Sequence, residues 1–183
     1  ARIPPQHPQL PPDPPANPMI AIMIAFLREL VRTPSVFLPG VPGANEQRAA
    51  QVVHDLLSEW GWEPIWEEVA PGRPNVIADL HGSAGNSTRT LILEGHTDVV
   101  TPGDPAAWSH DPFSGEIVGG RMYGRGTADM KGGVAALLFA VYTGKDALTS
   151  ALTWATVVVF IVMACSVGPA ARACRHRSRG RCT

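Results

Sequence analysis

The sequence predicts an α/β domain built on a mixed, largely parallel sheet that is flanked by helices. Two observations support this prediction. The first is that segments with apolar residues at helical spacing alternate along the chain with short apolar segments typical of buried strands. The second is that glycine, proline, asparagine and serine residues separate these segments, as they do at turns. The hydrophobic content of 45% is ordinary for a globular core.

Three segments are predicted to be helical. The first covers residues 19–32 and ends near Thr33, because the residue before a proline avoids the α region. Asn45 can cap the second helix, and Gly61 follows it as a C-cap. The third covers residues 129–142. The second helix carries one apolar stripe that faces a core, formed by Ala49, Val52, Val53, Leu56, Leu57 and Trp60.

Three segments are predicted to be strands, at residues 63–69, 75–82 and 89–96. Residues 83–87, with the sequence SAGNS, form a predicted turn between the last two. Residues 115–124 resemble a hairpin centred on two adjacent glycines.

The two ends of the chain differ in composition from its middle, so we expect three regions. Residues 1–18 hold eight of the 18 prolines and form a disordered leader, because proline cannot join a helix interior or a central strand. Residues 19–146 form the domain and contain 15 of the 16 acidic side chains. Residues 147–183 contain five arginines and all three cysteines, and this abrupt change is typical of a reading frame lost near residues 144–150.

Residues 151–167 carry no charge and have two interpretations. One is a short transmembrane helix with a positive flank, which would anchor the module to a membrane. The other is a buried strand, which the valine, isoleucine, phenylalanine and threonine content favours. We therefore expect a cytoplasmic protein without a membrane partner. The cysteine-free body fits a reducing compartment, and its acidic charge argues against nucleic-acid binding.

Two polar segments, EGHTDVV at 94–100 and GRGTADMKGG at 124–133, carry the candidate chemistry. His96 offers a ring nitrogen suited to zinc, and Asp98 lies on the same side of an extended backbone, where it can accept the other ring N–H. Asp129 has two oxygens, which can bridge two metal ions about 3.5–4 Å apart.

Each of these residues also has a simpler explanation. A His-x-Asp pair arises by chance, and Asp129 can be an ordinary helix N-cap. Arg125 and Lys131 can form a solvated rim. The case for a site rests on the two segments occurring in this order with WSHDPF between them.

Residues 93–140 resemble the metal-binding core of the acetylornithine deacetylase / succinyl-diaminopimelate desuccinylase family of co-catalytic zinc peptidases, which includes aminoacylase and glutamate-carboxypeptidase relatives. The resemblance extends over about residues 19–145. It implies that His96 ligates one metal ion, that Asp129 bridges two, and that Asp98 supports His96 in catalysis. It also implies two Zn²⁺ or Co²⁺ ions and hydrolysis of amide bonds in N-acylated amino acids or small peptides.

The chain departs from the family pattern after its last predicted helix. In the family, a Glu-Glu pair stands at the end of the next strand, and its two residues serve as a base and as a metal ligand. This sequence has Cys165 and Ser166 there and no acidic residue after Asp146. We also expect the family's lid and dimerisation domain to be missing, because residues 147–183 leave no room for it. We therefore expect a truncated, inactive chain that does not form the family homodimer. The alternatives are a non-catalytic pseudoenzyme that binds a peptide-like ligand, and a module anchored through residues 151–167.

Overall fold

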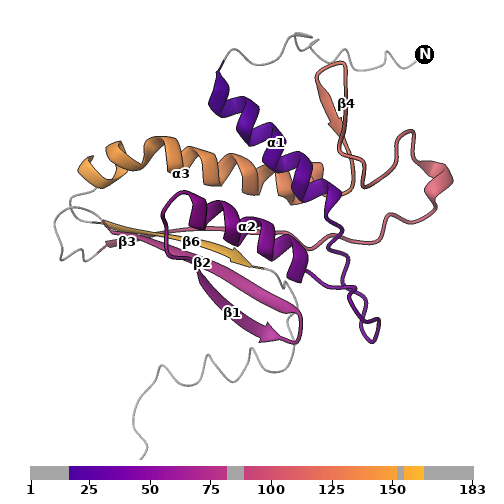
Figure 1. Ribbon diagram of the computed structural model, residues 1–183, viewed down its shortest axis with the longest axis horizontal. Helices are drawn as coiled ribbons and strands as arrows, with labels where there is room; N and C mark the ends of the chain where they lie inside the picture. Colours follow the sequence, from indigo (N-terminus) through magenta and orange to yellow (C-terminus); the bar gives the residue numbers. More distant parts are fainter. Residues whose placement is uncertain (1–16, 82–88, 152–154, 163–183) are drawn as a thin grey trace, which may run out of the picture.

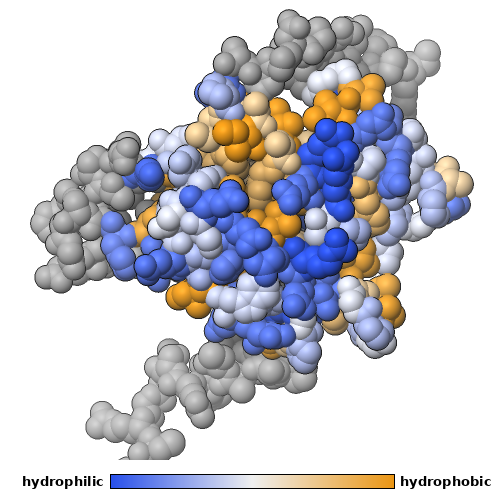
Figure 2. Space-filling model, viewed as in Figure 1, coloured by the Kyte–Doolittle hydropathy of each residue, from blue (hydrophilic) through white to orange (hydrophobic). Residues whose placement is uncertain are grey.

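The computed structural model describes residues 17–81, 89–151 and 155–162. Its main body is a four-stranded sheet with three helices, α1 (Pro18–Arg32), α2 (Gln47–Glu59) and α3 (Gly132–Ala151), on the same side of it (Figure 1). Helix α2 packs on strand β2 (Arg73–His81) and α3 on β3 (Arg89–His96), while α1 packs on both of these helices. Figure 2 shows mostly hydrophilic residues over α2, because the outer face of this helix is exposed to solvent.

Local capping explains where the first two helices begin. Helix α1 (Pro18–Arg32) starts after Asn17, whose side-chain oxygen accepts a hydrogen bond from the backbone N–H of Met19 at 2.9 Å. Helix α2 (Gln47–Glu59) starts where the Asn45 side chain accepts from the N–H of Gln47 at 3.1 Å. Gly61 adopts a φ of 75° just after α2, as expected of a C-cap glycine. The structure therefore confirms both predicted helices to within a residue or two.

Helix α3 (Gly132–Ala151) begins three residues later than the sequence predicts. The preceding turn, η2 (Thr127–Lys131), is not a regular helix, because Asp129 has φ −133° and ψ 100° and Met130 is also non-helical. Asp129 is therefore an extended residue that precedes the helix, and its side chain does not project from a helical turn.

The sheet has the strand order β1-β2-β6-β3 and is mixed, as predicted, but it is not largely parallel. Strands β1 (Ile65–Ala70) and β2 (Arg73–His81) are antiparallel, and so are β2 and β6 (Ala155–Val162); only β6 and β3 (Arg89–His96) are parallel. The correction has a simple cause. A two-residue connection between β1 and β2 permits only an antiparallel pair, whereas the long connection through α3 allows the parallel one.

The uncharged segment 151–167 has two interpretations, and strand β6 decides between them for the residues that the structure describes. Residues 155–162 pair with β2 on one side and β3 on the other, so they form a strand and not a helix. No helix within the described ranges is long and apolar enough to cross a membrane. Cys165 and Ser166, predicted to occupy the Glu-Glu positions, lie outside the described residues, as does most of the leader 1–18.

The core lies between the sheet and the helices, and a second, smaller unit lies beside it. The buried apolar residues come from all three helices and β2, among them Phe26, Leu30, Val53, Leu57, Val76, Ala78, Val134 and Leu138. Strands β4 (Glu116–Val118) and β5 (Arg121–Tyr123) form the predicted hairpin. Its turn residues, Gly119 and Gly120, have φ values of 57° and 74°, which is the backbone that a two-residue hairpin loop requires.

Candidate metal centre

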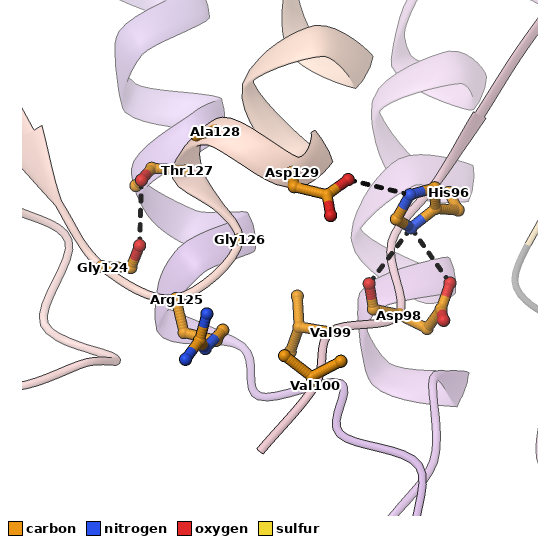
Figure 3. Close-up of a pocket in the computed structure, with 10 residues that line it drawn as sticks. All are labelled: His96, Asp98, Val99, Val100, Gly124, Arg125, Gly126, Thr127, Ala128 and Asp129. Atoms are coloured by element: carbon orange, nitrogen blue, oxygen red, sulfur yellow. Dashed lines mark hydrogen bonds and ion pairs between the residues drawn. The ribbon is translucent and has the colours of Figure 1, made fainter. Parts of the chain in front are cut away.

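His96 is the last residue of β3, so the strand places its imidazole at the carboxyl end of β3. Ring atom Nδ1 lies 3.1 Å from a carboxylate oxygen of Asp98 and 3.2 Å from the Asp98 carbonyl oxygen. Ring atom Nε2 lies 3.3 Å from a carboxylate oxygen of Asp129. The structure thus brings together His96, Asp98 and Asp129, the three residues that the sequence predicts, with the two carboxylates at opposite sides of the ring (Figure 3).

The histidine ring faces hydrogen-bond acceptors at both of its nitrogens. A neutral imidazole has only one N–H, and the two Asp98 oxygens at Nδ1 favour a proton on that atom. The lone pair of Nε2 then faces the Asp129 carboxylate, which repels it. The contact becomes favourable when the ring is protonated or when a cation lies between Nε2 and Asp129.

The separation of His96 Nε2 and the carboxylate oxygen of Asp129 suits a shared metal ion. Zinc ligands lie about 2.0–2.2 Å from the metal at tetrahedral angles, so two ligand atoms on one zinc are roughly 3.4 Å apart. The observed distance from Nε2 to the Asp129 oxygen is 3.3 Å. The Asp129 side chain is 89% exposed and therefore open to a ligand. Within the described residues, however, no group of three histidine, cysteine or acidic side chains could hold a metal ion, so the pair fits only part of a metal site.

A pocket of about 200 Å³ opens beside His96. Its wall includes Gly126, which has a φ of 87° and lies close to the segment that follows β3. A Cβ at this position would lie 2.6 Å from Cγ1 of Val99, so only glycine allows the two segments to approach this closely. The residues around the pocket are His96, Asp98, Val99, Val100, Gly124, Arg125, Gly126, Thr127, Ala128 and Asp129.

The loop that contains WSHDPF packs against the turn beneath the pocket. The backbone N–H of Arg125 donates to the Pro112 carbonyl at 2.6 Å, and the Arg125 guanidinium lies 4.9 Å from the centroid of the Trp108 ring. The Trp108 indole N–H donates to the Pro102 carbonyl at 2.9 Å. Arg125 is therefore partly buried against an aromatic ring and is not part of a freely solvated rim.

Lys131 is the residue near the site whose environment the sequence did not reveal. It is fully buried, with 0% exposure, where a solvated rim was one expectation. Its amine donates to the carbonyl oxygens of Leu30 at 2.7 Å and Thr33 at 2.9 Å. Burial lowers the pKa of the Lys131 amine from 10.5 to about 8. A lysine after a candidate ligand gives no sequence signal of burial, because lysine is almost always exposed.

Fold and site together define a mixed α/β domain in which a histidine at the carboxyl end of a strand lies between two carboxylates. Residues 92–162 match the model of peptidase family M20/M25/M40. This part of the chain belongs to that family, which confirms the resemblance seen in the sequence.

Relatives and solved structures agree with this assignment. The chain is 40% identical over 126 residues to succinyl-diaminopimelate desuccinylase of Methylorubrum extorquens, covering 67% of this chain and 30% of that protein. It is 47% identical over 118 residues to the desuccinylase of Rhodospirillum centenum, covering 64% and 29%. The chain thus spans about 30% of the length of the curated relatives that it matches.

Two solved structures resemble the fold. One is an M20 family metallo-carboxypeptidase of Sulfolobus solfataricus, with a TM-score of 0.64, 26% identity, and coverage of 76% of this chain and 30% of that chain. The other is human carnosine dipeptidase 1, with a TM-score of 0.64, 26% identity, and coverage of 91% and 39%.

Proposed function

We propose that this chain carries part of the catalytic domain of a metal-dependent hydrolase that cleaves amide bonds in N-acylated amino acids or small peptides. The observation that supports the proposal is the His96 ring, which has a carboxylate at each nitrogen and a metal-compatible distance to Asp129. The names of the relatives point to the same reaction class, since a desuccinylase and a dipeptidase both hydrolyse amide bonds.

In this proposal each of the three residues has a distinct task. The Asp98 carbonyl oxygen accepts the Nδ1–H of His96, and the Asp98 carboxylate lies 3.1 Å from the same ring atom, which fixes the ring and turns the Nε2 lone pair toward the pocket. His96 and Asp129 would be the residues that hold a Zn²⁺ or Co²⁺ ion. Such ions, when bound, lower the pKa of a bound water and polarise the amide carbonyl.

We further propose that these 183 residues by themselves bind metal weakly and do not turn over substrate. Two divalent ions need more ligands than one imidazole and one carboxylate. The sequence has Cys165 and Ser166, not a Glu-Glu pair, where a general base and a further ligand are expected. Without a base, the attacking water has no group to take its proton.

Titration with Co²⁺, followed by the NMR signals of residues 96–99, tests the metal site. In the wild-type chain, Co²⁺ should change the NMR signals of these residues. His96→Gln and Asp129→Asn should each abolish this change. His54→Gln is the matched control, because His54 lies on α2 and its side chain is 28% exposed, compared with 29% for His96. A response in the His96→Gln variant equal to that of wild type would refute the proposed ligands.

Activity is measured on an N-succinyl amino acid with excess Zn²⁺ or Co²⁺. We expect no turnover above the rate with metal alone. Turnover that requires His96 and two bound ions per chain would refute the proposed inactivity. Binding of the N-succinyl amino acid without metal would instead favour the non-catalytic pseudoenzyme.

A further inference from the structure

We propose that Lys131 is a positioning residue that holds Asp129 in place opposite His96. It does so by fastening the turn η2 to the carboxyl end of α1. The inference rests on the proposed metal site, since it assigns a task to a residue that supports one of the two proposed ligands.

The contacts of the Lys131 amine are directional and buried. It donates to the carbonyl oxygens of Leu30 and Thr33, in the last turn of α1 and at its C-cap. Carbonyl groups at the end of a helix lack partners within the helix and carry the negative end of its dipole, so they attract a cationic donor. Lys131 is 98 residues or more from these partners in sequence, so the contact joins two distant parts of the chain.

The rest of Lys131 fills the inside of the turn that carries Asp129. Its backbone N–H donates to the Gly126 carbonyl at 2.9 Å, which closes the turn. Its side-chain Cδ would lie 3.2 Å from a Cβ at Gly126, so the aliphatic stem packs directly against this glycine. Asp129 itself is 89% exposed, so packing around its own side chain does little to fix it. Its position therefore depends on how firmly the backbone of the turn is held.

The residues just after α1 also hold the segment that follows His96. The Ser35 hydroxyl donates to the Thr97 carbonyl at 2.5 Å, and the Val99 N–H donates to the Ser35 carbonyl at 3.2 Å. These bonds fasten residues 97–99, which include Asp98, to the residues just after α1. The segment 30–35 is thus a common support: Ser35 holds the side that bears Asp98, and Lys131 holds the side that bears Asp129.

A lysine that served only the stability of the fold would change the unfolding free energy and leave the metal pair unaffected in the folded protein. Two measurements on folded protein separate these roles. The first is the ¹⁵N order parameter of the Asp129 amide in the metal-free chain, and the second is the apparent Kd for Co²⁺ from the signals of residues 96–99. Both quantities are measured on the wild-type chain, on Lys131→Met and on Val53→Ala. The Val53→Ala variant removes buried volume in α2 away from the pocket.

In Lys131→Met we expect the Asp129 order parameter to fall from the rigid range, about 0.85, toward 0.6. We also expect the Kd for Co²⁺ to rise about 10- to 100-fold, the usual effect of removing a residue that supports a metal ligand. Val53→Ala should lower stability and leave both values as in wild type. If Lys131→Met does not fold, Lys131→Gln, which keeps N–H donors on a shorter stem, is measured by the same criteria.

An unchanged Asp129 order parameter and a Kd within twofold of wild type in the folded lysine variant would overturn the inference. Changes in the order parameter and in the Kd that are as large in Val53→Ala as in the lysine variant would also overturn the inference, because they would show that loss of stability alone loosens the turn. A wild-type chain that does not respond to Co²⁺ would refute the proposed function. The order parameter of the metal-free variant would in that case still decide whether Lys131 holds Asp129.

Discussion

The buried ion pair between Glu46 and Arg73 provides a direct test of what holds this domain together. Glu46 is fully buried at the start of α2, and the side chain of Arg73 at the start of β2 is 7% exposed. Arg73 approaches the Glu46 carboxylate through Nε at 3.0 and 3.1 Å and through a terminal nitrogen at 2.7 Å. Its guanidinium also lies 3.7 Å from the centroid of the Phe37 ring. The pair therefore joins the helix, the sheet and the loop between α1 and α2.

Glu46→Ala removes the carboxylate and leaves the guanidinium in a site with little water. We expect the free energy of unfolding to fall by about 3–5 kcal/mol, because breaking one partner of a buried pair leaves a charge uncompensated. That loss is a large share of the roughly 5–15 kcal/mol that stabilises a typical domain. The assay is urea unfolding, followed by tryptophan fluorescence and circular dichroism, with the m-value checked for constancy.

Two further variants make this prediction specific. Glu59→Ala removes an exposed carboxylate from the other end of α2 and should change the free energy of unfolding by no more than about 0.5 kcal/mol. Replacing both Glu46 and Arg73 by methionine should restore much of the stability lost in Glu46→Ala, since apolar residues of similar volume can substitute for a buried pair. If the free energies of unfolding of Glu46→Ala and Glu59→Ala differ by less than about 1 kcal/mol, the reasoning about the desolvated charge is wrong.

Three other variants address a glycine, a titrating lysine and a helix cap. Gly126→Ala should lower stability by more than about 1 kcal/mol in urea unfolding, because its φ is 87° and the added Cβ would meet Val99; a neutral effect would contradict this. For Lys131, the folded pKa of about 8 is below the unfolded value of 10.5, so the unfolded chain binds more protons between these values and stability rises with pH there. The unfolding free energy of metal-free wild type relative to Lys131→Met should therefore increase by about 3 kcal/mol from pH 8 to 10.5, and a flat difference would contradict the lowered pKa. Asn17→Ala should cost about 1 kcal/mol through loss of the α1 cap, measured against the exposed control Gln51→Ala, and an equal effect of both would argue against the cap.

Elements whose causes are local could be predicted well from the sequence. Asn45 marks the start of α2 because its side chain accepts a hydrogen bond from the N–H two residues later. Gly119 and Gly120 define the hairpin because they alone supply the backbone that its turn needs. His96 and Asp98 also form a local pair, since two residues of extended backbone place both side chains on one side.

Features that depend on distant partners could not be predicted in the same way. The sequence suggested a largely parallel sheet, but strand direction depends on which strands meet, and β6 pairs antiparallel with β2 as well as parallel with β3. The sequence predicts too early a start for α3 because Asp129 and Met130 look compatible with a helix, whereas both residues adopt non-helical backbone angles in the turn before it.

The sequence by itself determined the kinds of most elements and the approximate limits of the first two helices, and it singled out His96, Asp98 and Asp129 as candidates, because these follow from side-chain chemistry and spacing over a few positions. Tertiary structure alone decided that Asp129 reaches His96 from a separate turn, and that Lys131 is buried against the end of α1. The physical reason is that both contacts join segments far apart in the chain. Their geometry is set by the packing of α1 on α3 and of α3 on β3, which no local pattern of residues encodes.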